Sequence, residues 1–115
     1  MKSGYFFINE NILPCLFAIS QEEQTRGLMN VEAPVPNMLF INKIAKINKF
    51  WMKDTPSELD IIFCKNGKIV EICRGEPNST KIVGPDSLTD LVIELPYGTA
   101  KSLNISPGDS VGVIK

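Results

Sequence analysis

The sequence contains no histidine and only three cysteines, Cys15, Cys64 and Cys73. The lack of histidine removes Ser-His-Asp and Cys-His catalysis, the usual zinc sites and the commonest proton shuttle at neutral pH. The cysteines form no CxxC pair, so a metal site would need carboxylates that the fold alone brings to a cysteine. We therefore expect no metal and no cofactor, and we expect the thiols to act as small apolar side chains.

Arginine is also scarce, and neither sign of charge is in excess. Arg26 and Arg74 are the only arginines among 12 basic residues, and 13 acidic residues bring the net charge to -1. Such a balance creates no field that attracts nucleic acid or an anionic membrane. Arginine is the residue best suited to bidentate phosphate recognition. The composition therefore predicts no nucleic-acid partner and no membrane partner.

Long apolar runs are missing as well. No run approaches the ~20 residues that a membrane-spanning helix needs. Near the N-terminus the apolar run covers only residues 5–8, which is shorter than the roughly 7 to 15 apolar residues of a signal peptide. An odd number of cysteines fits a reducing compartment. These observations predict a soluble protein of the cytoplasm.

The hydrophobic sequence that is present suffices for one folded domain. The chain has 115 residues, of which 43% are hydrophobic and 22% charged, which predicts a single domain over residues 1–115. Alternating apolar runs separated by turn residues predict about seven to nine short strands, and hence a compact, mostly-β barrel or sandwich. The strands are expected at residues 5–8, 15–19, 38–41, 50–53, 59–65, 68–74, 91–95 and 111–114.

Two short helices complete the predicted fold. Ser20 and Glu23 have the spacing of a capping box, which predicts a helix over residues 21–26. Thr99 is the expected N-cap of a second helix that ends near residue 103.

A hairpin is the most specific local prediction. Asn66-Gly67, between two alternating apolar runs, is typical of a two-residue type I′ turn. That turn would pair Phe63 with Val70 and Asp60 with Cys73, and Asp60 would then point away from the face that carries Phe63. The core face of the hairpin is expected to carry Leu59, Ile61, Phe63, Val70 and Ile72.

Five segments carry a more distinctive pattern. They are Thr25-Arg26-Gly27-Leu28-Met29, Met38-Leu39-Phe40, Phe50-Trp51-Met52-Lys53-Asp54-Thr55, Leu59-Asp60-Ile61-Ile62-Phe63 and Val92-Ile93-Glu94-Leu95. Over about residues 24 to 113, the chain resembles domain-of-unknown-function family 192, a group of small bacterial and archaeal proteins. The resemblance implies the same mostly-β fold. It implies no activity, because none is established for that family.

The chain departs from the family pattern at several positions. Asp54 stands where the motif more often has Asn, Asn37 where Gly usually precedes Met-Leu-Phe, and Ser57-Glu58 where an apolar residue and Pro are usual. An ion pair between Asp54 and Lys53 could replace a neutral hydrogen bond, which would change the ligand preference of any site there. Many relatives are described as secreted, whereas we expect this chain in the cytoplasm.

A set of polar residues lies within these apolar segments, namely Arg26, Lys53, Asp54, Thr55, Asp60 and Glu94. In one interpretation the carboxylates face solvent or accept backbone N–H bonds from a neighbouring loop. In the other, several of these groups converge at one end of the barrel, where Arg26 and Lys53 supply positive charge. Met29, Met38 and Trp51 would then line a ligand pocket, although such side chains more often belong to the core.

The sequence does not identify a function, and two hypotheses follow from it. The first is a non-catalytic domain that binds a small polar ligand or a protein partner through the polar cluster. The alternative is a carboxylate-based hydrolase or lyase, with Asp60 or Glu94 as base and Lys53 as electrostatic stabiliser. It needs carboxyl groups roughly 5 to 9 Å apart. Monomer and homodimer both stay open, since an exposed edge strand at residues 5–8 could pair two copies.

Overall fold

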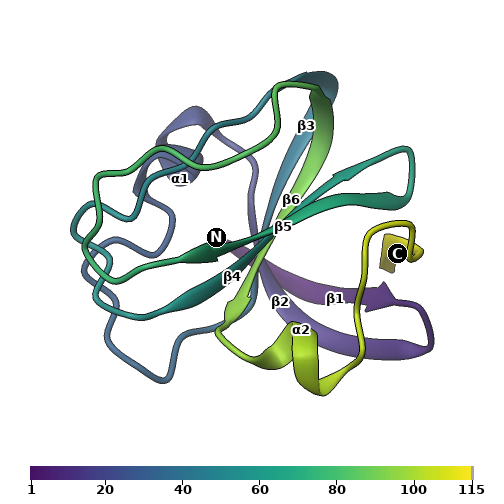
Figure 1. The fold of residues 1–115 in the computed structure, drawn as a ribbon, viewed down its shortest axis with the longest axis horizontal. Coiled ribbons are helices and arrows are strands. Elements are labelled where there is room, and N and C mark those ends of the chain that lie inside the picture. Colours follow the sequence, from purple (N-terminus) through teal and green to yellow (C-terminus); the bar gives the residue numbers. More distant parts are fainter. Residues whose placement is uncertain (115) are drawn as a thin grey trace.

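Seven strands form one sheet that curls into a half-barrel in the computed structural model, which describes residues 1–114 (Figure 1). The strand order is β5-β4-β6-β3-β2-β1-β7. The predicted mostly-β architecture with two short helices is thereby confirmed. The elements are β1 (Lys2–Ile8), β2 (Asn11–Ala18), α1 (Gln21–Arg26), β3 (Met38–Ile47), β4 (Leu59–Lys65), β5 (Lys68–Gly75), β6 (Leu88–Pro96), α2 (Thr99–Ser102) and β7 (Val111–Ile114).

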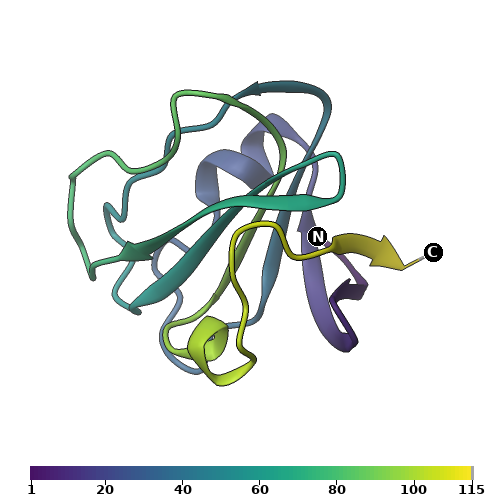
Figure 2. The ribbon, with the colours of Figure 1, turned by 45° about the vertical axis from the view of Figure 1, so that its right-hand side comes forward.

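The two ends of the strand order meet at the tip of the β4–β5 hairpin. The Val111 amide donates to the Gly67 carbonyl at 3.0 Å, and the Ile69 amide donates to the Asp109 carbonyl at 2.9 Å. These bonds bring the segment before β7 against the hairpin, as Figure 2 shows. The predicted edge strand at residues 5–8 is therefore wrong, because β1 pairs with β2 on one side and with β7 on the other.

Side chains pack in two layers, one on each face of the sheet. The interior of the curl holds residues from all seven strands, including Phe6, Leu39 and Ile62. A second core lies on the opposite face, where Phe40 and Phe63 pack under irregular segments of the chain. Residues 59–64 are all buried, because β4 is a central strand covered on both faces.

One parallel pair places α1 on the outer face. Strands β2 and β3 are parallel neighbours, whereas the other strand pairs are antiparallel. A parallel pair needs a long crossover, and here the crossover contains α1 and residues 27–37. Figure 1 shows α1 and the other long connections on the left of the sheet, and α2 below it.

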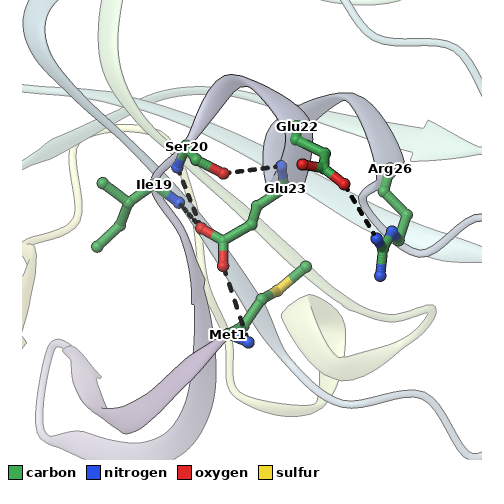
Figure 3. Close-up of polar contacts among 6 residues, drawn as sticks. All are labelled: Met1, Ile19, Ser20, Glu22, Glu23 and Arg26. Carbon is green, nitrogen blue, oxygen red and sulfur yellow. Dashed lines mark hydrogen bonds and ion pairs between the residues drawn. The ribbon is translucent and has the colours of Figure 1, made fainter.

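The predicted capping box at the start of α1 is confirmed. The Ser20 hydroxyl accepts from the Glu23 amide at 3.1 Å, and the Glu23 carboxylate accepts from the Ser20 amide at 3.1 Å. Figure 3 shows that the same carboxylate also accepts from the Ile19 amide, and that the amino group of Met1 lies 3.7 Å away. These contacts fix where the first turn begins and lower the pKa of Glu23 below its ordinary value.

The hairpin turn is confirmed, but its register slips. Positive φ values of 50° at Asn66 and 75° at Gly67 agree with a type I′ turn. A bulge then shifts the pairing so that Phe63 faces Glu71 rather than Val70. Val70 is the extra residue, and its 39% exposure shows that its predicted place in the core is wrong.

The slip also changes which residues are paired near the open end of the hairpin. Asp60 faces Arg74 instead of Cys73, and Ile72 faces Ile62. Ile72 consequently packs against the interior core rather than on the face of Leu59 and Ile61.

Three other sequence predictions are corrected. Residues 50–53 form no strand beyond a single bridge from Phe50 to Val83. The Lys- and Asn-rich segment of residues 42–49 lies between the predicted strands at residues 38–41 and 50–53, but β3 extends into it as far as Ile47, with a bulge between residues 41 and 46. Thr99 is not the cap of α2, because the N-cap is Gly98 and the Thr99 hydroxyl donates to the Pro96 carbonyl.

Asp60 supplies the missing cap of α2 from the neighbouring strand. Its Oδ2 accepts from the amides of Gly98 at 3.1 Å and Ala100 at 2.9 Å, and its side chain is 6% exposed. Of the two interpretations of this carboxylate, the geometry matches the one in which it anchors a loop. Neither helix among residues 1–114 is long and apolar enough to cross a membrane.

We predict that Asp60→Asn lowers the free energy of unfolding by about 2 kcal/mol, because hydrogen bonds to a charged group contribute about 1.5–3 kcal/mol. Urea denaturation measures the change. Asp54→Asn is the matched control, since Asp54 is exposed with a φ of 55°, a conformation that Asn adopts readily. Equal effects at the two positions would contradict the anchoring role of Asp60.

Candidate functional site

A cavity of about 280 Å³ opens between α1, the outer face of the sheet and the segment that follows β3. We call it the Glu94 pocket, after the one acidic residue in its lining. The α1 side contributes polar side chains, the sheet and the segment after β3 contribute mainly apolar and aromatic ones, and basic residues are present on two sides. The lining residues are Gln21, Gln24, Thr25, Arg26, Gly27, Leu28, Met29, Phe40, Lys46, Asn48, Lys49, Phe50, Trp51, Thr55 and Glu94.

An aromatic cluster forms the apolar wall. The ring of Phe50 packs edge-to-face on Phe40, with centroids 5.0 Å apart, and on Phe63, with centroids 5.8 Å apart. Two backbone bonds between Phe50 and Val83, of 2.9 and 2.8 Å, hold the segment in place. Trp51, the only tryptophan, is 44% exposed, and the Lys53 ammonium lies 5.5 Å from its ring centroid.

A hydrogen-bonded network of amides forms the polar wall. The Gln24 side chain donates to the carbonyls of Ala18 and Ile41, both at 3.0 Å, and accepts from the Asn42 amide. The Asn48 side chain in turn donates to Asn42 at 3.0 Å and to the Thr89 hydroxyl at 2.8 Å. The network ties α1 to β3 and β6 where the bulge interrupts the ladder between those strands.

Glu94 lies at the buried end of the pocket and is 5% exposed. On β6 it pairs with Met38 of β3 on one side and Ile61 of β4 on the other, so its neighbours on the sheet are apolar. Its carboxyl makes no hydrogen bond or ion pair among the described residues 1–114, and its oxygens keep contact with the cavity rather than being fully enclosed. Burial raises the pKa of Glu94 to about 8, and no nearby cation offsets the effect.

The basic residues of the lining are at the mouth rather than at the buried end. The Arg26 side chain is 65% exposed and lies 3.6 Å from the exposed Glu22 carboxylate (Figure 3). Lys46 is exposed and has no ion-pair partner within the described part of the chain. The Lys49 ammonium donates to the Gly84 carbonyl and to Asp86, which lowers the pKa of Asp86.

The structure brings together five of the eight residues that the sequence singled out: Arg26, Met29, Trp51, Thr55 and Glu94 all line the Glu94 pocket. Lys53 and Asp54 lie beside it in an exposed turn. Asp60 is elsewhere, on the face of β4 that points into the curl. Met38 belongs to the outer core.

Asp60 and Glu94 lie on opposite faces of the sheet. In the ladder between β4 and β6, Asp60 faces Leu95 while Glu94 faces Ile61, so their side chains point in opposite directions. The pair of carboxylates that a hydrolase or lyase would need is therefore not formed by these two residues.

Sequence reasoning missed the amides of Gln24 and Asn48 and the ammonium groups of Lys46 and Lys49. Three of them lie in or next to the Lys- and Asn-rich segment, whose polar composition resembles a loop. The capping box could have identified Gln24, because it places this residue on the helix that faces β3, but no sequence signal marks the other three.

None of the three cysteines lines the Glu94 pocket. Burial raises the pKa of Cys15 to about 11 and that of Cys64 to about 12, and burial together with a hydrogen bond to Glu71 raises the pKa of Cys73 to about 12. Over residues 1–114, no three Cys, Asp or Glu side chains gather in a way that could hold a metal ion.

We predict that Glu94 makes the stability of the protein fall with rising pH. The pKa of Glu94 lies near 8 in the folded state, above its ordinary value of 4.5. Its contribution is therefore fully present below pH 4.5 and is lost as the pH rises through 8. A tenfold change in a protonation equilibrium corresponds to about 1.4 kcal/mol, so the loss between pH 5 and pH 9 is on the order of 4 kcal/mol.

The measurement compares urea denaturation of the wild type with Glu94→Gln from pH 5 to pH 9. The Gln variant keeps the shape and cannot ionise, so the wild type should lose stability relative to it as the pH rises. Parallel pH profiles for the two proteins would show that Glu94 is not held in a desolvated site.

Comparison with known proteins agrees with the fold and gives no activity. The chain is similar to a protein of unknown function from Novosphingobium aromaticivorans DSM 12444, with 26% identity and a TM-score of 0.87 over 94% of this chain and 83% of the other. It is also similar to a protein from Sinorhizobium meliloti 1021 described as a "putative transcription regulator", with 28% identity and a TM-score of 0.89 over 97% and 94% of the two chains. No curated protein matches.

The sequence profile of one family, described as Uncharacterized ACR, matches residues 8–113. That match covers nearly the whole chain and confirms the resemblance seen in the five sequence segments. The protein belongs to domain-of-unknown-function family 192.

Proposed function

We propose that this protein is a non-catalytic domain that binds a small polar ligand in the Glu94 pocket. The observation that carries the proposal is Glu94, which is 5% exposed, lines the cavity and has a carboxyl desolvated by burial with no hydrogen bond to offset it among residues 1–114. Desolvation disfavours the charged form of the carboxyl. A ligand that pairs with Glu94 would offset this desolvation, which no contact within residues 1–114 does.

The chemistry of the lining supports binding over catalysis. Glu94 is the one carboxyl group in the described lining, so the pocket holds no second carboxyl for a paired acid and base. The aromatic wall and the few convergent polar groups are typical of small-molecule sites. The description of the Sinorhizobium protein as a regulator finds no support in a net charge of -1, which does not favour DNA.

A fragment screen by NMR tests the proposal. Trp51 gives a single indole N–H resonance at the pocket, so ¹⁵N-labelled protein reports binding there directly. We expect small polar fragments to shift the signals of Trp51, Gly27 and Thr55 at millimolar concentration.

Two variants locate the site. Thr25→Phe narrows the mouth from an exposed position on α1 and should abolish these shifts. Thr80→Phe, on an exposed loop outside the lining, should leave them unchanged. A screen in which no fragment shifts the pocket signals, or in which Thr25→Phe has no effect, would refute the proposal.

A further inference from the structure

We infer that the ligand of the Glu94 pocket is a small organic anion with an uncharged hydroxyl or amide group at its other end. The inference rests on the proposed function and adds the orientation and the chemical class of the ligand. Glu94 would receive the uncharged end, and Arg26 and Lys46 would hold the anionic end at the mouth.

The depth of the charged groups sets this orientation. Glu94 is 5% exposed, whereas the Arg26 side chain is 65% exposed and Lys46 is exposed on β3. A ligand that fills the pocket must therefore meet the carboxyl at its inner end and the two cations at its outer end. The cations are too distant to hold Glu94 in its ionised form, since burial alone determines its pKa of about 8.

The charge balance of the lining favours an anion. Arg26, Lys46 and Lys49 are basic, and Glu94, the one acidic residue, is mostly protonated at pH 7 because burial raises its pKa to about 8. Asp86 neutralises Lys49, and the Glu22 contact with Arg26 is exposed and hence weak. A net positive charge is therefore left at the mouth, where a carboxylate or phosphate can accept charge-assisted hydrogen bonds.

A protonated carboxyl at the buried end suits an uncharged group. It can donate one hydrogen bond and accept another, which matches a hydroxyl or a primary amide. A second anion there would gain nothing from cations that lie at the mouth, and an amine would have to ionise Glu94 in apolar surroundings. Between the two ends, Phe40, Phe50 and Trp51 offer a surface for a ring or a short apolar chain.

A matched set of four probes tests the inference. They are 4-hydroxybenzoate, which has both ends, benzoate, which lacks the hydroxyl, 4-hydroxybenzamide, which lacks the anion, and tyramine, which carries a cation instead. Dissociation constants come from NMR titration of the Trp51 indole signal at pH 6.5. Losing one hydrogen bond, whether at the uncharged end or at the anionic end, corresponds to about a tenfold change in affinity, so 4-hydroxybenzoate should bind about tenfold tighter than each of the other three.

Two variants test which protein residue contacts each end of the ligand. Arg26→Gln, at an exposed position, should weaken 4-hydroxybenzoate about fivefold to tenfold and leave 4-hydroxybenzamide unchanged. Glu94→Leu removes the buried acceptor and should bring 4-hydroxybenzoate down to the affinity of benzoate. Arg74→Gln removes a cation outside the lining and serves as the control for Arg26→Gln.

The outcomes separate the two proposals. Preference for tyramine would overturn the inference, because Glu94 would then bind a cation. Equal binding of 4-hydroxybenzoate and 4-hydroxybenzamide, or an unchanged affinity in Arg26→Gln, would overturn the anionic end. If none of the four probes binds while other fragments shift the pocket signals, this inference fails and the proposed function stands. If no fragment at all shifts those signals, the proposed function fails as well.

Discussion

Burial of β4 on both faces is the constraint that shapes the rest of the molecule. A strand with residues 59–64 all buried needs a layer of side chains on each side. The curl of the sheet supplies one layer from its own strands. The other is supplied by irregular segments such as residues 28–35 and 48–58, which have no ladder to set their spacing. The Glu94 pocket lies in that second, irregular layer.

Local sequence signals predicted the elements that short-range chemistry determines. Asn66-Gly67 and the Ser20 and Glu23 pair each act within a few residues, and both occur as expected. The wrong predictions concern elements whose conformation depends on contacts with segments far away in the sequence. The alternation of Phe50 and Met52 reflects packing onto the outer core rather than a strand, and β1 is no edge because the last strand of the chain pairs with it.

The candidate site also depends on contacts that the local sequence does not reveal. Asp60 and Glu94 give identical signals, a single carboxylate within an apolar strand. Their environments differ because backbone amides at the start of α2 reach Asp60, whereas only open space lies over Glu94. No pattern within β4 or β6 encodes which segment will cover which face. The set of polar residues could therefore be recognised from the sequence. The sequence could not show that Asp60 anchors α2 whereas Glu94 lines a pocket.

Phe50 gives the pocket a rigidity that its irregular backbone would not have alone. Its ring packs between Phe40 of the pocket wall and Phe63 of the buried strand β4. Its backbone N–H and C=O groups both form hydrogen bonds with the backbone of Val83. The wall cannot rotate without opening the core beneath it. A ligand would thus meet a preorganised surface and would forfeit little conformational entropy in ordering it, which leaves more of the contact energy as affinity.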